Sequence, residues 1–226
     1  EKNYDNGQLN GIETRWHANG KKQSETEWGG GKILSKEYMD SVKQICDKNE
    51  LKLHIDGARI FNASVALEMP VSELTKSVDS LTFCLSKGLG APVGSVIVGN
   101  KEFINDARKW RKMVGGGMRQ AGIIAAAGII GINNHYAQIS KDHKNAKLLS
   151  EGLKRFKEIT VEEVQTNLVF FSINTENPGL LAEKLKAKDV LGGNGGSRWR
   201  FATHYGIEEQ DIKDTLNIFE QSIKEL

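Results

Sequence analysis

The sequence predicts an α/β protein, because segments with helical and with strand-like patterns alternate along its first part. Residues 35–49 have the apolar spacing of a helix, and Ser35 stands where it can cap the first turn. Strand-like runs at 51–55 and 80–85 flank a predicted helix at 58–67. In an open α/β sheet the ligand lies beyond the carboxyl ends of the strands. We therefore expect the turns after these two strands to lie together.

The pattern changes after Lys154. Before it, a strand at 94–98, a helix at 103–114 and a long helix from about residue 120 are predicted. After it, short strands and two helices predict a smaller α+β domain at the C-terminus. Its expected elements are strands at 161–164, 168–173 and 198–203 and helices at 178–188 and 208–223.

The first 28 residues have a different sequence pattern from the rest of the chain. Two Asn-Gly dipeptides, at 6–7 and 19–20, each follow an aromatic residue, and Asn-Gly is the strongest two-residue hairpin signal. The segment resembles hairpin repeats of the MORN type, which are interaction or scaffold modules. We expect three parts: a β-hairpin segment at 1–28, a large domain at 29–150 and a small domain at 151–226.

Composition agrees with a soluble enzyme and gives no sign of a nucleic-acid or membrane protein. The formal charge is +2 over 226 residues, with both signs intermixed, so no basic face is expected. The longest apolar run, 121–132, is too short for a span that needs about 20 residues. Two cysteines and the lack of a signal-like segment indicate a cytoplasmic location. No group of residues has metal-ligand spacing.

One lysine and one aspartate carry the strongest chemical signal. Lys87 lies between a strand-like run and a glycine-rich turn, and Asp56 ends another strand 31 residues earlier. Either feature alone is usually an ordinary turn or solvated surface. Together and in this order they are the layout of a pyridoxal phosphate enzyme, in which a lysine binds the cofactor as a Schiff base. The aspartate would keep the pyridine nitrogen protonated, so that the ring accepts electrons.

Three motifs resemble one known family. They are HIDGARIFNA at 54–63, CLSKGLGAPVGS at 84–95 and RKMVGGGMRQAG at 111–122. They look like consecutive signatures of the low-specificity L-threonine aldolases, which are fold type I pyridoxal phosphate enzymes. The resemblance runs from about Gly30 to the C-terminus. It implies an incomplete large domain followed by the small C-terminal α+β domain.

The resemblance also implies what the matched region lacks. Members of the family carry, ahead of it, a turn that binds the cofactor phosphate and a histidine that stacks on the pyridine ring. Neither has a counterpart here, and His17 lies in the hairpin-like segment at the wrong place. We therefore expect this chain by itself to bind the cofactor weakly and to turn over little substrate.

The same resemblance assigns roles to six residues. Lys87 and Asp56 are implied as catalytic residues that also bind the cofactor. Arg59 and Arg200 match the arginines that bind the substrate carboxylate, a group that a planar guanidinium meets with two hydrogen bonds. Arg59 is also assigned to the cofactor site. Lys112 and Arg119 match residues that reach the neighbouring subunit's site, with Arg119 directed toward the phosphate and Lys112 toward the substrate.

Each of the less specific residues has a plainer interpretation. Arg200 could extend from a sheet edge into solvent, and Lys112 lies in a basic run that would ordinarily be a solvated helix face. His204 is more often a structural histidine than a base. The glycine-rich stretch 192–196 lacks the spacing of a phosphate-binding loop and indicates a connection instead.

The implied reaction is cleavage of L-threonine or L-allo-threonine to glycine and acetaldehyde, by a homodimer or homotetramer acting on a small amino acid. Two alternatives stay open. One is a non-catalytic, truncated or fused aldolase fragment whose N-terminal repeat serves interaction. The other is a different pyridoxal phosphate enzyme, such as a β-eliminating lyase or an aminotransferase.

Overall fold

The computed structural model describes residues 4–5, 8–9, 11–16, 22–28, 32–192 and 196–226. The chain forms two compact units. One, which we call the lysine unit, contains residues 33–145 and 203–208. The other, the C-terminal unit, contains residues 1–32, 146–202 and 209–226.

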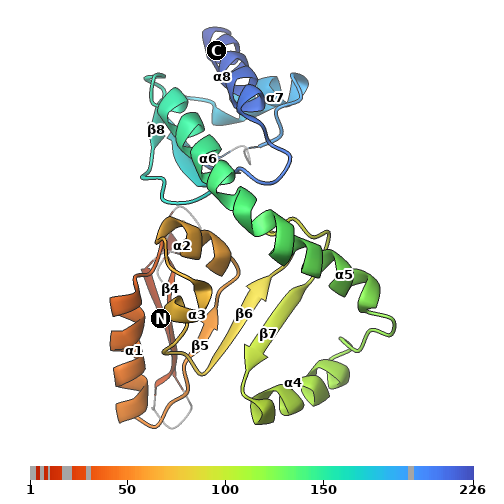
Figure 1. The fold of residues 1–226 in the computed structure, drawn as a ribbon. Helices are drawn as coiled ribbons and strands as arrows, with labels where there is room; N and C mark the ends of the chain where they lie inside the picture. The colour runs from red at the N-terminus through yellow and green to blue at the C-terminus, as the bar shows by residue number, and fades with distance from the viewer. Residues whose placement is uncertain (1–3, 6–7, 10, 17–21, 29–31, 193–195) are drawn as a thin grey trace. The chain divides into compact units, whose positions relative to one another are not determined.

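A three-stranded mixed sheet forms the centre of the lysine unit (Figure 1). Strand β5 (His54–Asp56) pairs in parallel with β6 (Ser80–Cys84), and β7 (Ser95–Gly99) pairs antiparallel with β6. In this register Asp56 is the partner of Thr82, so β5 and β6 end at the same edge of the sheet. This confirms that the turns after the two predicted strands lie at one edge.

Helices α1 (Lys36–Lys48), α2 (Ile60–Ala66), α3 (Val71–Leu74) and α4 (Lys101–Met113) complete this part of the unit. As predicted, Ser35 caps the first of them, because its Oγ accepts a hydrogen bond from Tyr38 N over 3.2 Å. Helix α3 is a single turn that starts directly after Pro70. It was not expected, because four residues are too few to show a period of 3.6.

Apolar side chains from the sheet and its helices form the core of the lysine unit. Leu74, Leu81, Leu85 and Leu89 are buried there, and Phe61 of α2 meets Phe83 of β6 edge to face, with ring centroids 5.3 Å apart. Leu85 and Leu89 lie beyond the end of β6, on either side of Lys87. The core therefore extends beneath the turn that carries the predicted cofactor lysine.

The long helix expected from about residue 120 is interrupted. Helix α5 (Gly122–Ile130) passes into a π-helical turn (Gly131–His135) and a 3₁₀ turn (Tyr136–Gln138) before α6 (Ile139–Leu153) begins. At the π turn the backbone of Gly131 approaches Leu89 so closely that a Cβ would lie 2.6 Å from Leu89 O. His135 Nδ1 lies 3.0 Å from the same carbonyl oxygen. The widened turn thus coincides with the place where the helix packs against the lysine turn.

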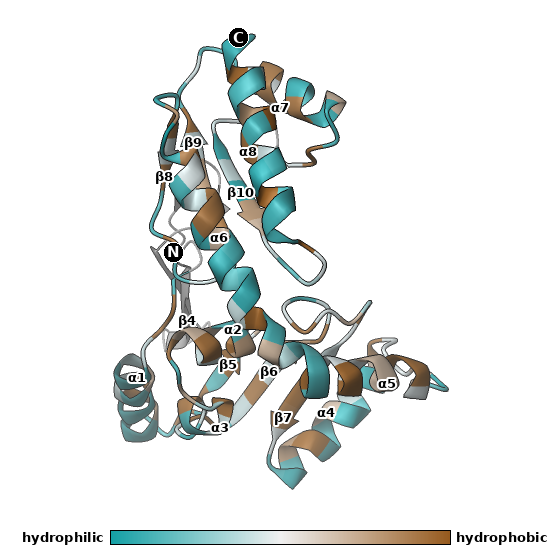
Figure 2. Cartoon of the chain, turned by 45° about the horizontal axis from the view of Figure 1, so that its top comes forward, coloured by the Kyte–Doolittle hydropathy of each residue, from teal (hydrophilic) through white to brown (hydrophobic). Residues whose placement is uncertain are grey.

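Large apolar side chains are exposed on β7, α4 and α5 of the lysine unit. Figure 2 shows stretches of hydrophobic residues along these three elements. Val114 is 78% exposed and Ile123 is 79% exposed. We call these residues the apolar surface; its members are Ile97, Val98, Phe103, Trp110, Met113, Val114, Met118, Ile123, Ile129 and Ile130. Water-exposed apolar area of this extent is typical of an interface.

The C-terminal unit contains an antiparallel sheet in the order β10-β9-β8. Its strands are β8 (Ile159–Val161), β9 (Leu168–Ile173) and β10 (Arg198–Ala202), and its helices are α7 (Pro178–Ala187) and α8 (Glu209–Lys224). Phe171 of β9, Trp199 of β10 and Phe219 of α8 are all buried, with ring centroids 5.8 to 6.5 Å apart. Three strands and two helices around an aromatic core confirm the predicted α+β pattern.

The N-terminal residues form two strand pairs. Strand β1 (Tyr4–Asp5) is antiparallel to β2 (Gln8–Leu9), and β3 (Gly11–Trp16) is antiparallel to β4 (Lys22–Trp28). Antiparallel pairing is what the hairpin prediction requires, whereas the two Asn-Gly dipeptides lie outside the described residues. The repeat character of 1–28 and the boundaries at residues 28 and 150 stay predictions.

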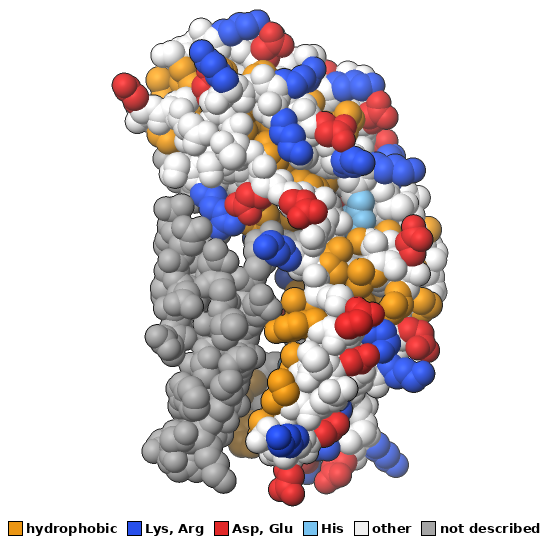
Figure 3. All heavy atoms as spheres, turned by 90° about the vertical axis from the view of Figure 1, so that its left-hand side faces the viewer, with side chains coloured by type: hydrophobic (Ala, Val, Ile, Leu, Met, Phe, Trp, Pro, Cys, Tyr) orange, Lys and Arg blue, Asp and Glu red, His pale blue; other side chains and the backbone are white. Residues whose placement is uncertain are grey.

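Charged side chains of both signs are interspersed over the face shown in Figure 3. This agrees with the small formal charge of +2. Among the described residues, no helix is long and apolar enough to cross a membrane.

Asp142 is a buried carboxyl group in the lysine unit. Asp142 lies on α6 and is 3% exposed. Its backbone oxygen accepts a hydrogen bond from Thr203 Oγ1 over 2.6 Å. Burial raises the pKa of Asp142 to about 6, although the nearby charges of His204 and Lys141 act in the opposite direction. The folded protein therefore favours the protonated form of Asp142 more than the unfolded chain does.

We expect the stability contributed by Asp142 to be complete below its unfolded pKa of about 3.9 and to be lost as the pH rises through 6. Asparagine has nearly the shape of the protonated carboxyl group and carries no charge at any of these pH values. At pH 8, Asp142→Asn should therefore raise the free energy of unfolding by about 1–3 kcal/mol. At pH 4 the two proteins should unfold alike in urea. Asp106→Asn, on the exposed face of α4, is the control and should change stability by less than about 0.5 kcal/mol. An Asp142 variant that is less stable at pH 8 would contradict the argument.

Candidate active site

Asp56 is the last residue of β5 and stands at the edge of the sheet. Its Oδ1 accepts a hydrogen bond from Ala58 N over 3.2 Å, which starts the turn into α2. The next residue, Gly57, donates from its backbone N–H to Thr82 O over 2.7 Å. A Cβ at Gly57 would lie 2.5 Å from Leu81 Cδ1, so glycine lets the chain stay against β6 here. Asp56 is thereby fixed beside the end of the strand that precedes Lys87.

Lys87 projects from a closed turn between β6 and β7. Leu85 N donates to Gly94 O over 2.9 Å, and Ala91 N donates to Leu85 O over 3.0 Å. Within the turn, Gly90 N donates to Lys87 O over 2.9 Å. Gly90 has a φ of +69° and Gly94 a φ of +117°, which favour glycine. The glycines in this motif thus let the chain return from the lysine turn into β7.

The π turn supports the lysine turn from below. Leu89 is almost completely buried, and its carbonyl oxygen contacts both Gly131 and His135. The His135 ring stacks on Tyr205, with centroids 4.2 Å apart. These residues all belong to the lysine unit, so the lysine turn packs against the π turn within that unit.

Arg59 lies in the connection from β5 to α2, directly before the first residue of α2, and is half-buried. The connection leaves the sheet at the edge where β6 also ends. The structure therefore brings Asp56, Arg59 and Lys87 to one edge of a single sheet.

The other three predicted residues lie elsewhere. Lys112 is in the last turn of α4 and Arg119 follows the glycine triplet, and both are exposed. Helix α4 begins after β7, whose last residue pairs with Ser80 at the opposite edge of the sheet from Lys87. Arg200 is an exposed residue on β10 of the C-terminal unit, opposite Phe170.

Comparison with known proteins identifies the family. A model of the beta-eliminating lyase family matches residues 24–176, which is about two thirds of the chain. The chain belongs to the beta-eliminating lyase family. The match includes Asp56, Arg59 and Lys87, and it confirms the family to which the three motifs point.

Curated relatives in this family are low-specificity L-threonine aldolases. The chain is 45% identical to low-specificity L-threonine aldolase 1 of Arabidopsis thaliana over 202 residues, covering 86% of this chain and 56% of the relative. It is 43% identical to the low-specificity L-threonine aldolase of Escherichia coli K12 over 184 residues, covering 81% of this chain and 55% of the relative. The chain thus spans little more than half the length of these relatives.

Solved structures show the same fold. The Leishmania major threonine aldolase matches with a TM-score of 0.68 at 18% identity, covering 85% of this chain and 58% of that one. A PLP-dependent aminotransferase from Streptococcus suis matches with a TM-score of 0.64 at 14% identity, covering 88% of this chain and 55% of that one. These matches confirm a partial fold type I architecture, and together with the family they indicate pyridoxal phosphate as the cofactor.

Two residues of the lysine unit suit two parts of pyridoxal phosphate. Lys87 suits its aldehyde carbon, and Asp56 suits its pyridine nitrogen. Among the described residues, Lys87 Nζ takes part in no ion pair or hydrogen bond, so its amine is available to an aldehyde. Asp56 Oδ2 accepts no hydrogen bond from the described residues, and a carboxylate is the natural partner of a pyridinium N–H. The two side chains extend from neighbouring strand ends.

Two polar residues near this edge, the buried Asn62 and the half-buried His143, were not predicted as site residues. Asn62 of α2 lies within hydrogen-bonding distance of His143 of α6, with Nδ2 and Nε2 3.2 Å apart. Burial lowers the pKa of His143. The only hint in the sequence is a polar residue on the apolar side of the predicted helix at 58–67, and its partner follows 81 residues later.

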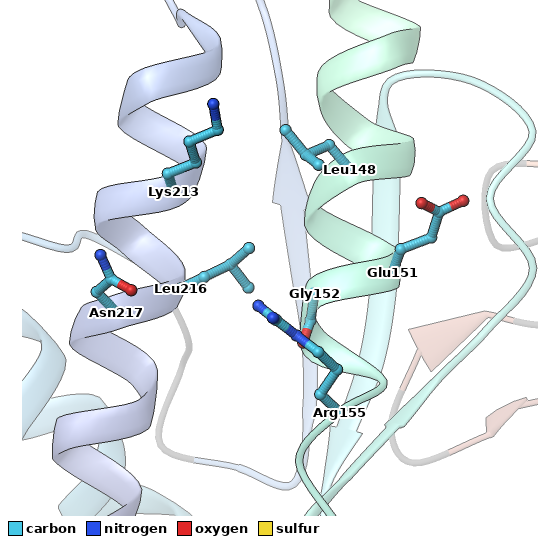
Figure 4. Close-up of a pocket in the computed structure, with 7 residues that line it drawn as sticks. All are labelled: Leu148, Glu151, Gly152, Arg155, Lys213, Leu216 and Asn217. Carbon is cyan, nitrogen blue, oxygen red and sulfur yellow. The ribbon is translucent and has the colours of Figure 1, made fainter.

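A pocket of about 540 Å³ lies within the C-terminal unit, between α6 and α8 (Figure 4). Leu148 and Leu216 face each other across it, while Arg155 reaches across from the end of α6. Arg155 Nε donates to Gly152 O over 3.2 Å, and Lys213 pairs with Glu209. The pocket contains none of the six predicted site residues, so it is not the candidate active site of this lyase-family chain.

The contact between the π turn and Leu89 predicts that one methyl group added at Gly131 will destabilise the folded protein. Gly131→Ala would place a Cβ 2.6 Å from Leu89 O, a backbone atom that cannot turn aside. We expect it to lower the free energy of unfolding by about 1–3 kcal/mol.

Gly122→Ala is the matched control for this prediction, since a Cβ at Gly122 meets nothing within 4 Å. It should leave stability unchanged or raise it by up to about 1 kcal/mol. Urea unfolding of both variants measures the difference. Equal stability of the two alanine variants would show that Leu89 O is not held against the helix.

Proposed function

We propose that this chain carries the lysine site of a pyridoxal phosphate-dependent aldolase that cleaves L-threonine or L-allo-threonine to glycine and acetaldehyde. The observation that carries the proposal is the placement of Asp56 and Lys87 at the ends of the parallel strands β5 and β6. The similarity to aldolases, at 43–45% identity, selects this reaction from the chemistry that such a pair supports.

Lys87 and Asp56 have separate tasks in this reaction. Pyridoxal phosphate, when bound, withdraws electrons from the bonds at the substrate's α-carbon. The Lys87 amine would hold the cofactor at its aldehyde carbon until the amino group of the substrate takes its place there. The Asp56 carboxylate would accept a hydrogen bond from the pyridine N–H and so keep that nitrogen protonated.

The arginines and the second lysine would bind anions. Arg59, at the same sheet edge as Lys87, and Arg200, on β10, are assigned to the substrate carboxylate. Holding the carboxylate fixes which α-carbon bond stands perpendicular to the cofactor ring and therefore which bond breaks. The exposed positions of Lys112 and Arg119 suit residues that serve the substrate and the phosphate in a neighbouring subunit.

A second candidate is β-elimination, which the name of the family supports. It uses the same lysine and aspartate but expels a group from the β-carbon instead of breaking the bond between Cα and Cβ. The products decide between the two reactions, because elimination from serine yields pyruvate and ammonia, whereas aldol cleavage of threonine yields glycine and acetaldehyde.

We also infer that the chain acts as a homodimer or homotetramer. The apolar surface on β7, α4 and α5 supports this, because it adjoins the loop that carries Arg119. Cys46 and Cys84 are free and half-buried, which suits the reducing cytoplasm.

The proposed role of Lys87 is tested by trapping. Incubation with pyridoxal phosphate and reduction with borohydride should place the cofactor mass on the peptide containing Lys87. Lys87→Ala should lose that adduct and the accompanying absorbance band, with its circular dichroism unchanged. Lys101→Ala, which removes an exposed lysine at the start of α4, is the control and should keep both signals. A band that persists in Lys87→Ala would rule out the assignment.

Self-association through the apolar surface is tested by adding a charge. Val114→Lys should shift the chain toward a smaller species in light scattering at micromolar concentration, because a buried unpaired charge opposes association. Leu191 of the C-terminal unit is the matched control, being 80% exposed but outside the apolar surface. Leu191→Lys should leave the mass unchanged. A wild-type chain that is already monomeric would contradict the proposal.

A further inference from the structure

The side-chain amide of Asn62 packs directly against the backbone of the residue that follows Lys87. Asn62 is 1% exposed. A Cβ added to Gly88 would lie 2.6 Å from Asn62 Oδ1, 3.3 Å from its Cγ and 3.4 Å from its Nδ2. The whole amide group therefore occupies the space where a side chain of residue 88 would be.

His143 fixes the direction in which this amide points. Asn62 Nδ2 can only donate, so His143 Nε2, 3.2 Å away, must accept and the ring must carry its proton on Nδ1. Burial lowers the pKa of His143, which favours this neutral ring. With Nδ2 bound to His143, Oδ1 is turned toward Gly88, and it has no hydrogen-bond partner among the described residues.

The lysine turn is closed on its other sides by backbone hydrogen bonds and by the π turn. Gly90 N bonds to Lys87 O, and Leu89 lies on Gly131. These contacts hold the Lys87 carbonyl and the residues after position 88. The Asn62 amide is the contact that meets Gly88 itself, next to the residue whose Nζ must reach the cofactor.

We infer that Asn62, oriented by His143, is a positioning residue that holds the Lys87–Gly88 backbone and so sets the place from which the Lys87 amine projects. The inference rests on the proposed function of Lys87. A displacement of such a group by about 1 Å can lower the rate of a reaction about 100-fold. Asn62 touches neither cofactor nor substrate in this role and acts through Gly88.

The first experiment measures the Lys87 amine itself. Wild type, Asn62→Ala and Asn145→Ala are incubated with pyridoxal phosphate, reduced with borohydride, and compared by the adduct on Lys87 relative to that on Lys101. Asn145 is the matched control, a buried asparagine of the same unit that donates to Ile207 O over 2.8 Å. We expect a loss of about tenfold or more in Asn62→Ala and a change of less than about twofold in Asn145→Ala.

The same proteins are labelled with acetic anhydride, and the labelling profile, meaning the extent of modification at each lysine, reports the reactivity of Lys87 without any cofactor. In Asn62→Ala the labelling of Lys87 should change relative to that of the exposed Lys101. If pyridoxal phosphate does not select Lys87 in wild type, the proposed function fails, and the acetylation profile still decides the role of Asn62. Identical profiles in wild type and Asn62→Ala would overturn the inference.

Rescue separates positioning from a general loss of structure. Gly88→Ala should lower Lys87 modification, because its methyl group meets Asn62 Oδ1, and adding Asn62→Ala should restore part of it by opening that space. His143→Gln retains an acceptor for Asn62 Nδ2 and should label Lys87 nearly as wild type does, whereas His143→Leu should label it less. Failure of both rescues, with folded variants, would show that the amide only fills space.

Discussion

The parallel pairing of β5 with β6 is the constraint on which the candidate site depends. Antiparallel neighbours would send their carboxyl ends to opposite edges, and Asp56 and Lys87 would then be separated by the length of the strands. The pairing of Asp56 with Thr82 sets the register, and the N–H of Gly57 bonds to Thr82 O as the chain leaves the sheet. Every other feature of the site refines the position of these two ends.

The lysine turn is held by segments that are far apart in the sequence. Helix α2 contributes Asn62, the π turn contributes Gly131 and His135, and the connection from β10 to α8 contributes Tyr205. Three of these four contacts involve backbone atoms of the turn or a glycine. A turn restrained at its backbone leaves its side chain free for chemistry, and Lys87 is such a side chain.

Much of this architecture could be predicted because its signals are local. The Ser35 cap, the strand before Lys87 and the glycines with positive φ after it all depend on neighbouring residues. The contact between Asn62 and His143 joins residues 81 positions apart, and no periodic pattern in the sequence indicates it. The π turn was missed because the apolar run 121–132 is compatible with an uninterrupted helix, and only packing against Leu89 explains the widening. The roles of all six predicted site residues stay predictions, and those of Lys112 and Arg119 also require a neighbouring subunit.

The π turn also absorbs one extra residue without changing the phase of the helix. A π turn holds one residue more than an α-helical turn, whereas each residue of a regular α-helix advances the helix by about 100°. Removal of one residue from Gly131–His135 would therefore let this turn become α-helical and would keep Ile139, Asp142 and Asn145 facing the core. Removal of one residue from α6 itself would instead rotate the residues on one side of the gap by about 100° and turn buried side chains outward. A one-residue deletion should thus be tolerated better at the π turn than in the helix that follows it.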